Sequence, residues 1–298
     1  MKIKNVTVAG AGVLGSQIAW QTAMHGFNVT VYDAFEEGLK RGKEFHKKFA
    51  DLFLTNRGVA QDEIDSAFAR LSYTTNLEEA VKDADLVSES VPENPDIKKQ
   101  FYTDIAAFAP EKTIFTTNSS TMLPSSFAEF TGRPEKFLAL HFANPVWDAN
   151  VGEVMMHPGT DPQYFDIVIA FAKSIGMIPV PILKEKNGYV LNSLLIPLLT
   201  AAQELYFDGV SDFESIDKTW MISTGAKTGP FGILDMVGLQ TVYNITMLDG
   251  KRTNNKKVLE RAARIKKEWI DKNKMGISTG EGFYKYPNPR YKDPDFLS

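Results

Sequence analysis

The start of the chain combines an apolar run, a glycine-rich turn and an acidic residue in a fixed order. Residues 3–9 are mostly apolar and β-branched, which predicts a strand, and the sequence GAGVLG follows at 10–15. A helix is expected after the turn, because Gly26 is well placed to end one. A second run at 27–32 then leads to Asp33. This order of strand, turn, helix, strand and acid predicts a Rossmann-like fold that binds a dinucleotide.

Each residue of the glycine turn has a physical reason to be there. Gly10 permits the tight turn, and Gly15 lets the helix pack closely on the strand. Gly12 has no side chain, so the backbone can approach a pyrophosphate. The next residues, Val13 and Leu14, begin the helix, whose free N–H groups and positive dipole end favour phosphate. We therefore expect these five residues to contact the cofactor.

Asp33 predicts which dinucleotide binds. Its carboxylate would accept hydrogen bonds from the ribose hydroxyls of adenosine, and its charge would repel a 2′-phosphate. The prediction is therefore NAD rather than NADP. The alternative is an ordinary glycine-rich turn between a strand and a helix, but the strand, the helix and the acid together favour the cofactor.

The composition is ordinary for a soluble globular protein and restricts the possible partners. A length of 298 residues predicts about two domains. The 33 basic residues against 37 acidic ones give a net charge of −4, which suggests no nucleic-acid partner. The absence of cysteine excludes disulfides and thiol catalysis. No apolar stretch approaches the ~18 residues that a membrane span needs, and no signal-peptide pattern is seen. We therefore expect a cytoplasmic protein without a membrane partner.

The chain divides at a polar segment, 184–188. Before it, strands and helices alternate up to a last strand at 177–183, so 1–184 is predicted to be an NAD-binding, Rossmann-like α/β domain. After it the chain reads as helical, and 187–298 is predicted to be an all-α domain for substrate binding and dimerisation. Its expected elements are helices at 189–207, 213–224, 234–248 and 258–273, a loop at 229–232 and a Pro-rich surface tail at 287–298. Two nearly all-apolar helices favour a homodimer interface over a self-contained domain closing over a cleft.

Polar residues follow two of the predicted parallel strands, at the edge where such sheets bind ligands. Glu93 follows the strand at 85–89, and Lys98 lies in the next helix. Ser120 belongs to a polar cluster after the strand at 113–117. All three are candidates for cofactor or substrate contacts. The alternatives are an acid that begins a helix, a surface lysine and a helix cap.

His141 differs from the other three histidines because it follows the buried-looking strand sequence FLAL and precedes the polar turn at Asn144. No histidine pair has the spacing of a metal site, so no metal is expected. By itself such a histidine is more often structural. The dinucleotide fold changes this interpretation, because a dehydrogenase needs a base to take the hydroxyl proton as hydride leaves.

Several short motifs resemble those of the L-3-hydroxyacyl-CoA dehydrogenase family, including its short-chain 3-hydroxybutyryl-CoA members. They are NSS at 118–120, HFANP at 141–145, Glu153 and NGYVLN at 187–192. The similarity runs over nearly the whole chain, from GAGVLG to GEGFYKY at 280–286. These motifs are far more specific than the glycine turn alone.

The resemblance implies a role for each matching residue. His141 would be the catalytic base, with Glu153 as its partner in a dyad. Ser120 and Asn192 would hydrogen-bond the reacting substrate, and Asn144 would lie beside the nicotinamide and the substrate oxygen. Three further residues match positions that contact the cofactor or coenzyme A: Glu93, Lys98 and Lys285.

The implied reaction is the NAD-dependent interconversion of an L-3-hydroxyacyl-CoA and a 3-ketoacyl-CoA, as in β-oxidation and other fatty acid or butanoate metabolism, by a homodimer. One departure lies next to the predicted site: residues 145–152 read PVWDANVG, where the family has a more apolar run with a lysine. The preferred chain length is therefore left open. Two alternative functions are an NAD-dependent dehydrogenase of a free hydroxy or sugar acid and a non-catalytic NAD-binding protein. The intact dyad and amide positions count against the second.

Overall fold

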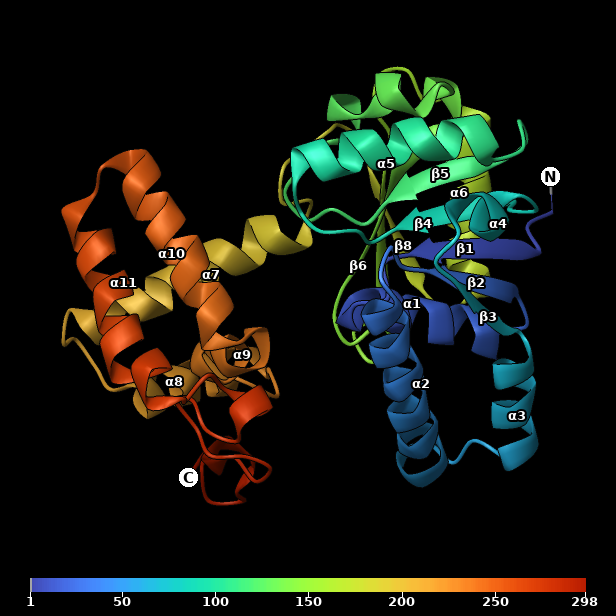
Figure 1. Ribbon diagram of the computed structural model, residues 1–298. Helices are drawn as coiled ribbons and strands as arrows, with labels where there is room; N and C mark the ends of the chain where they lie inside the picture. Colours follow the sequence, from blue (N-terminus) through green and yellow to red (C-terminus); the bar gives the residue numbers. More distant parts are fainter. Residues whose placement is uncertain (1) are drawn as a thin grey trace. The chain divides into compact units, whose positions relative to one another are not determined.

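The computed structural model describes residues 2–298 and divides into two compact units, one ending at Asn192 and one covering Ser193–Ser298. The first unit is an eight-stranded sheet with helices on both faces (Figure 1). Among the described residues, no helix is both long and apolar enough to cross a membrane.

The sheet has the order β3-β2-β1-β4-β5-β6-β7-β8. The strands are β1 Asn5–Ala9, β2 Asn28–Tyr32, β3 Leu71–Thr74, β4 Leu86–Glu89, β5 Ile114–Thr117, β6 Phe137–Phe142, β7 Val151–Met155 and β8 Ile178–Ile182. The first six run parallel in the order 3-2-1-4-5-6 of a doubly wound dinucleotide-binding sheet. β7 then runs antiparallel to β6 and parallel to β8. The predicted Rossmann-like fold is therefore confirmed.

The helices packed around the sheet in the described part of the chain are α1 Val13–Met24, α2 Glu36–Asn56, α3 Gln61–Ala69, α4 Leu77–Val81, α5 Pro95–Phe108 and α6 Pro162–Ser174. Short 3-10 turns lie at Pro124–Ser126, Ala128–Thr131 and Pro134–Lys136. Local signals explain several starts. Asn76 accepts a hydrogen bond from the amide of Glu79 and so caps α4, as the sequence predicts, and Asn94 caps α5 in the same way.

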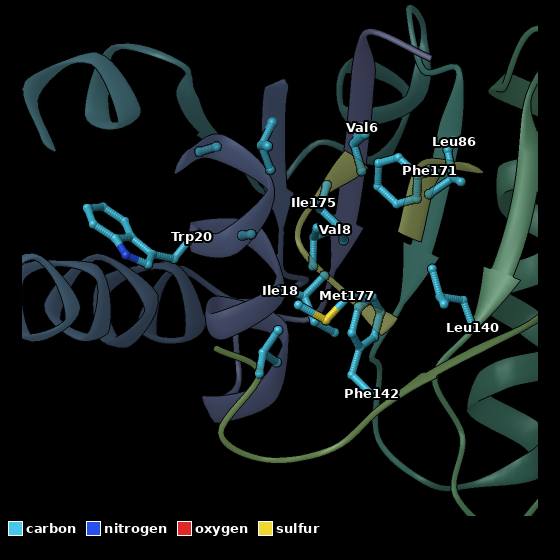
Figure 2. Close-up of a cluster of buried hydrophobic side chains, with 14 of the residues drawn as sticks. Val6, Val8, Ile18, Trp20, Leu86, Leu140, Phe142, Phe171, Ile175 and Met177 are labelled. Atoms are coloured by element: carbon cyan, nitrogen blue, oxygen red, sulfur yellow. The ribbon is translucent and has the colours of Figure 1, made fainter. Parts of the chain in front are cut away.

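Alternation along β1 supplies both faces of the core, because successive side chains of a strand point to opposite sides. Val6 and Val8 pack in the cluster formed with α1, α2 and α6, whereas Ala9 packs on the other face with α4 and α5. Figure 2 shows part of the larger cluster, in which Phe171 and Ile175 reach the strands from α6 and its end. This two-sided burial holds the carboxyl ends of the parallel strands at one edge of a rigid sheet.

The second unit is helical, and its elements are α8 Phe213–Thr224, α9 Pro230–Val237, α10 Leu239–Thr253 and α11 Lys256–Glu268, preceded by α7 Leu191–Phe207, which begins at the end of the first unit. Figure 1 shows α10 and α11 running side by side. Asp212 caps α8 through the amide of Ser215, and α8 has the predicted bounds.

Two expectations for this unit are wrong. The sequence predicts a loop at 229–232, but Pro230 begins α9, where its missing N–H costs nothing. The predicted helix at 234–248 is instead broken at Gly238, whose φ of 89° ends α9 before α10 begins.

The Pro-rich end of the chain is also not a surface tail throughout. The side chains of Tyr291 and Phe296 are buried in the core of the second unit, with Phe296 fully covered. Burial of these two aromatic side chains therefore holds the Pro-rich segment against the helices of the second unit.

Candidate active site

The glycine turn has the backbone geometry that a dinucleotide needs. Gly10 has a φ of 104°, and a Cβ placed on it would lie 2.3 Å from the carbonyl oxygen of Ser90. A Cβ on Gly15 would lie 1.9 Å from the carbonyl oxygen of Gly10. Above Gly12, by contrast, a Cβ would meet nothing within 4 Å. Two glycines are thus required for packing, and the third leaves space beside the backbone for a phosphate group.

The beginning of α1 and Asp33 complete this cradle. Gly12 caps the helix without a side-chain hydrogen bond, so the N–H groups of the first turn, from Val13 and Leu14 onward, are not taken by a cap. The carboxylate of Asp33 accepts hydrogen bonds from the amides of Ala11 at 3.0 Å and Phe35 at 3.1 Å. It is half-buried just beyond the end of β2. These residues fit the pyrophosphate and the ribose of a dinucleotide.

The register of β6 and β7 brings His141 and Glu153 together. The two residues are direct partners in the antiparallel ladder, and His141 Nδ1 lies 2.9 Å from Glu153 Oε2. Both side chains are buried. Because an ionised carboxylate can only accept, Nδ1 carries a proton, and in the neutral imidazole Nε2 is then the acceptor. Ser120 Oγ lies 2.9 Å from that Nε2.

The other oxygen of Glu153 holds the first turn of α7. Glu153 Oε1 accepts hydrogen bonds from the amides of Val190 at 2.9 Å and Leu191 at 2.8 Å. Burial raises the pKa of Glu153, but the hydrogen bonds from His141 and the two amides outweigh it and hold the pKa below its usual value. The group therefore stays a carboxylate at neutral pH.

Asn144 is held by a glutamine that the sequence does not single out. Its Oδ1 accepts a hydrogen bond from Gln17 Nε2 at 2.9 Å, and Gln17 Oε1 accepts one from the amide of Val146 at 2.9 Å. Gln17 is buried on α1, the helix that follows the glycine turn. The turn after β6 is thereby tied to the cofactor cradle. A polar residue on the buried face of an apolar helix is the signal that could have identified Gln17.

Glu93 and Lys98 belong to one buried ion cluster. Lys98 Nζ lies 2.6 Å from Glu89 Oε1 and 3.2 Å from Glu93 Oε2. The side chains of Lys98 and Glu89 are almost fully buried, whereas that of Glu93 is 40% exposed. Burial alone would raise the pKa of Glu93. Hydrogen bonds from Ser119 and Thr121 and the charge of Lys98 outweigh burial, so the pKa lies below its usual value. Glu93 is thus the accessible member of the cluster. Glu89, which closes β4, is a residue that the sequence does not single out.

The remaining predicted residues lie in different places. Asn192 follows Leu191 in the first turn of α7 and is half-buried, next to the amides that bind Glu153. Lys285 lies in the second unit and is exposed.

The segment that departs from the family pattern packs on α2. The Trp147 ring lies 4.9 Å from that of Phe49 and 5.3 Å from that of Phe53, and Asp148 pairs with Arg57 at 2.6 Å. Trp147 therefore packs on α2, and Asp148 pairs with the residue that ends this helix, while the expectation that the segment borders the site stays a prediction.

The arrangement can take up and return one proton beside a dinucleotide. A buried imidazole has an acceptor nitrogen, an acid behind it and a hydroxyl at hydrogen-bonding distance. Within residues 2–298, no group of three or more histidine, aspartate or glutamate side chains could hold a metal ion.

Comparisons with known proteins identify the family of the two parts of the chain. The model of the 3-hydroxyacyl-CoA dehydrogenase NAD-binding domain matches residues 5–186, and that of the 3-hydroxyacyl-CoA dehydrogenase C-terminal domain matches 188–286. The mitochondrial hydroxyacyl-coenzyme A dehydrogenase of Homo sapiens is 33% identical over 95% of this chain and 91% of its own. The "probable 3-hydroxybutyryl-CoA dehydrogenase" of Bacillus subtilis is 31% identical over 96% of this chain and 98% of its own.

Solved structures are also similar. A diketoreductase described as acting on dicarbonyl compounds is 53% identical, with a TM-score of 0.90, over 96% of this chain and 100% of its own. FadB2 of M. tuberculosis is 27% identical, with a TM-score of 0.86, over the same shares of the two chains.

Proposed function

Because the chain belongs to the 3-hydroxyacyl-CoA dehydrogenase family and is an NAD-dependent dehydrogenase, we propose that it interconverts L-3-hydroxyacyl-CoA and 3-ketoacyl-CoA at His141 and Glu153. The observation that carries the proposal is the buried pair itself, 2.9 Å apart, with Ser120 on the far nitrogen of the imidazole. The dinucleotide cradle at the end of the same parallel sheet supports it.

The proton follows a short path in this proposal. His141 Nε2 takes the proton of the substrate 3-hydroxyl, and Ser120 Oγ, which is within hydrogen-bonding distance of that nitrogen, holds the substrate oxygen. Glu153 keeps the imidazole in the required tautomer and stabilises the imidazolium. Such general-base assistance contributes roughly 10²–10⁴-fold to the rate. In the reverse direction the imidazolium returns the proton. Bound NAD supplies the acceptor for the hydride.

The other predicted residues keep their proposed roles around this step. Asn144 is tied by Gln17 to α1. It would lie beside the nicotinamide and the substrate oxygen when both are bound. Asn192 contributes a second hydrogen bond to the substrate. Glu93, which is the exposed end of its ion cluster, is the contact for the cofactor, and Lys98 acts there through Glu93. Lys285, which lies in the part of the chain that matches the C-terminal domain of the family, would also contact the cofactor.

A second candidate substrate is a dicarbonyl compound without coenzyme A. The 53% identity with the diketoreductase favours it, because that similarity exceeds the identity with the coenzyme A-dependent relatives. The same base and cofactor would serve both substrates. The two candidates therefore differ in whether the protein also binds a coenzyme A group.

The test is NADH oxidation with acetoacetyl-CoA, longer 3-ketoacyl-CoAs, free acetoacetate and a diketo ester. The proposal expects the largest kcat/KM with one of the thioesters. Turnover of the diketo ester with none of the thioesters would establish the second candidate. No oxidation with any of them would contradict both candidate substrates.

The proposed reaction belongs to fatty acid or butanoate metabolism, and we propose that it takes place in the cytoplasm. We also propose that the protein is a homodimer formed through the second unit. Helices of that unit expose large apolar side chains, including Leu194 at 70% and Leu248 at 69%. Covering such side chains stabilises an interface. Sedimentation equilibrium tests this point, and a monomer at all concentrations would contradict it.

A further inference from the structure

A tyrosine covers one face of the proposed base. The ring of Tyr189 lies 4.5 Å from the imidazole ring of His141, centroid to centroid, and the planes differ by 19°, so the rings are stacked. Tyr189 is 1% exposed. The imidazole is thus fixed by a contact on its face in addition to Glu153 on Nδ1 and Ser120 on Nε2.

The backbone of Tyr189 is in a conformation that an aromatic residue seldom adopts. Its φ is 53°, and the other non-glycine residues with positive φ in the described chain are Asn254 and Asn273. Asparagine tolerates this region, whereas a bulky side chain is strained there. Such strain persists only where the surroundings enforce it, and it concentrates at functional sites. The strain indicates that contacts of the surrounding segment hold Tyr189 in this conformation.

That segment holds the other half of the dyad as well. The amides directly after Tyr189, those of Val190 and Leu191, donate to Glu153 Oε1. Before it, Asn187 Nδ2 donates to the carbonyl oxygen of Thr121, the residue after Ser120, at 2.6 Å. Residues 187–191 therefore contact the imidazole, its carboxylate partner and the loop that carries the serine.

The phenol of Tyr189 stays protonated. Burial raises the pKa of Tyr189, and the negative charges of four carboxylates raise it further: Glu153, Glu93, Glu89 and Glu185. The side chain stays a neutral phenol at any working pH. What Tyr189 offers to His141 is therefore its ring, which limits rotation of the imidazole and presents a π face that an imidazolium prefers.

We propose that Tyr189 is a positioning residue for His141, which it holds by ring stacking in the plane set by Glu153 and Ser120. The inference rests on the proposed function of His141 as the base. Its consequence is that the ring, and not the hydroxyl, supports turnover.

Two variants separate these contributions. Tyr189→Phe keeps the ring, and its kcat stays within about twofold of wild type, since the stack is retained. Tyr189→Leu removes the ring, and its kcat falls about 10- to 100-fold, because small misplacements of a reacting group cost that much. The KM for NADH is unchanged in both. Tyr189→Met fills the space without a ring and carries the same expectation if the leucine variant does not fold.

A readout without turnover makes the test independent of the reaction. Long-range ¹H–¹⁵N spectra of the histidine side chains distinguish the two tautomers, and the His141 signals are identified by their loss in His141→Gln. Wild type and Tyr189→Phe show one tautomer with the proton on Nδ1. In the ring-free variants the imidazole rotates away from Glu153 for part of the time, and the signals of the two tautomers are averaged. Unchanged kcat and signals in a folded ring-free variant would overturn the inference, as would an equal loss in Tyr189→Phe. Full turnover by His141→Gln would instead refute the proposed function, while the spectra still report on Tyr189.

Discussion

Replacing Glu153 by glutamine should reverse the tautomer of His141 while keeping the shape of the site. The amides of Val190 and Leu191 donate to one oxygen of Glu153, so the carbonyl oxygen of a glutamine must take that place. Its NH₂ group then faces His141 Nδ1, 2.9 Å away in the wild type, and donates to it. In the opposite orientation, the NH₂ group of the glutamine would face the N–H groups of Val190 and Leu191, and two donors cannot bond each other. The imidazole proton must therefore move to Nε2, where it blocks the acceptor that the proposed mechanism needs.

The expected cost follows from this reversal. A base in the wrong tautomer loses the contribution of general-base catalysis and of its oriented acid, about 10³–10⁴-fold in kcat. That range corresponds to about 4–5.5 kcal/mol in the activation free energy. The assay is steady-state NAD reduction with the L-3-hydroxyacyl form of the best substrate, because this direction uses the Nε2 acceptor. NADH binding, followed by the cofactor's fluorescence, should stay near the wild-type value because the cradle is untouched.

A matched control is Glu129→Gln, which makes the same chemical change at an exposed position. It should leave kcat unchanged. A Glu153→Gln enzyme that keeps kcat within tenfold of wild type would refute the reasoning, because the tautomer would then be set by something other than Glu153. A variant that loses NADH binding together with turnover would also contradict it, since the loss would not be confined to the base.

Three further predictions concern the cradle and the second unit. Gly12→Ala should weaken NADH binding and leave the melting temperature nearly unchanged, since a Cβ there meets no atom of the protein within 4 Å. Gly15→Ala should lower the melting temperature, because its Cβ would lie 1.9 Å from a backbone oxygen. Similar melting temperatures for the two variants would contradict this. Asp33→Ser should lower the preference for NADH over NADPH, measured as a ratio of kcat/KM values, and an unchanged ratio would show that another group reads the ribose. Burial raises the pKa of Asp217 from 3.8 to about 6. Between these two pH values the native state therefore binds more protons than the unfolded chain. The free energy of unfolding should fall as pH rises from about 4 to about 6. The change is about 3 kcal/mol, and urea unfolding of Asp217→Asn should lack it; parallel pH profiles for the variant and wild type would exclude Asp217 as its source.

Local signals in the sequence predict the dinucleotide turn and several helix starts, whereas α3, β7 and α6 were not predicted. The spacing from Gly10 to Asp33 gives the turn and the acid, and the structure has both in the expected places. The caps at Asn76 and Asp212 begin helices where predicted, because an N-cap is decided by neighbours within three residues. His141 was identifiable because an apolar strand leads into it.

Contacts between distant residues were not predictable in this way. Nothing local indicates that Gln17 reaches Asn144, since 127 residues separate them. The pairing of Glu89 with Lys98 depends on how α5 packs over β4, and the burial of Phe296 depends on a core formed by helices far from it in sequence. Each of these depends on tertiary packing that outweighs the tendency of the local segment.

The register between β6 and β7 has a consequence for how this chain can vary. Because side chains alternate along a strand, a slip of one residue would place Gly152 or Val154 opposite His141 and turn the carboxylate of Glu153 to the other side of the sheet. The connection at 143–150 can therefore accept new residues far more easily than a new length. A single inserted or deleted residue there would be harmful even where the sheet still forms, while exchanges such as those around Trp147 leave the alignment of the two strands intact. Engineering of this connection should accordingly change its composition and keep its number of residues.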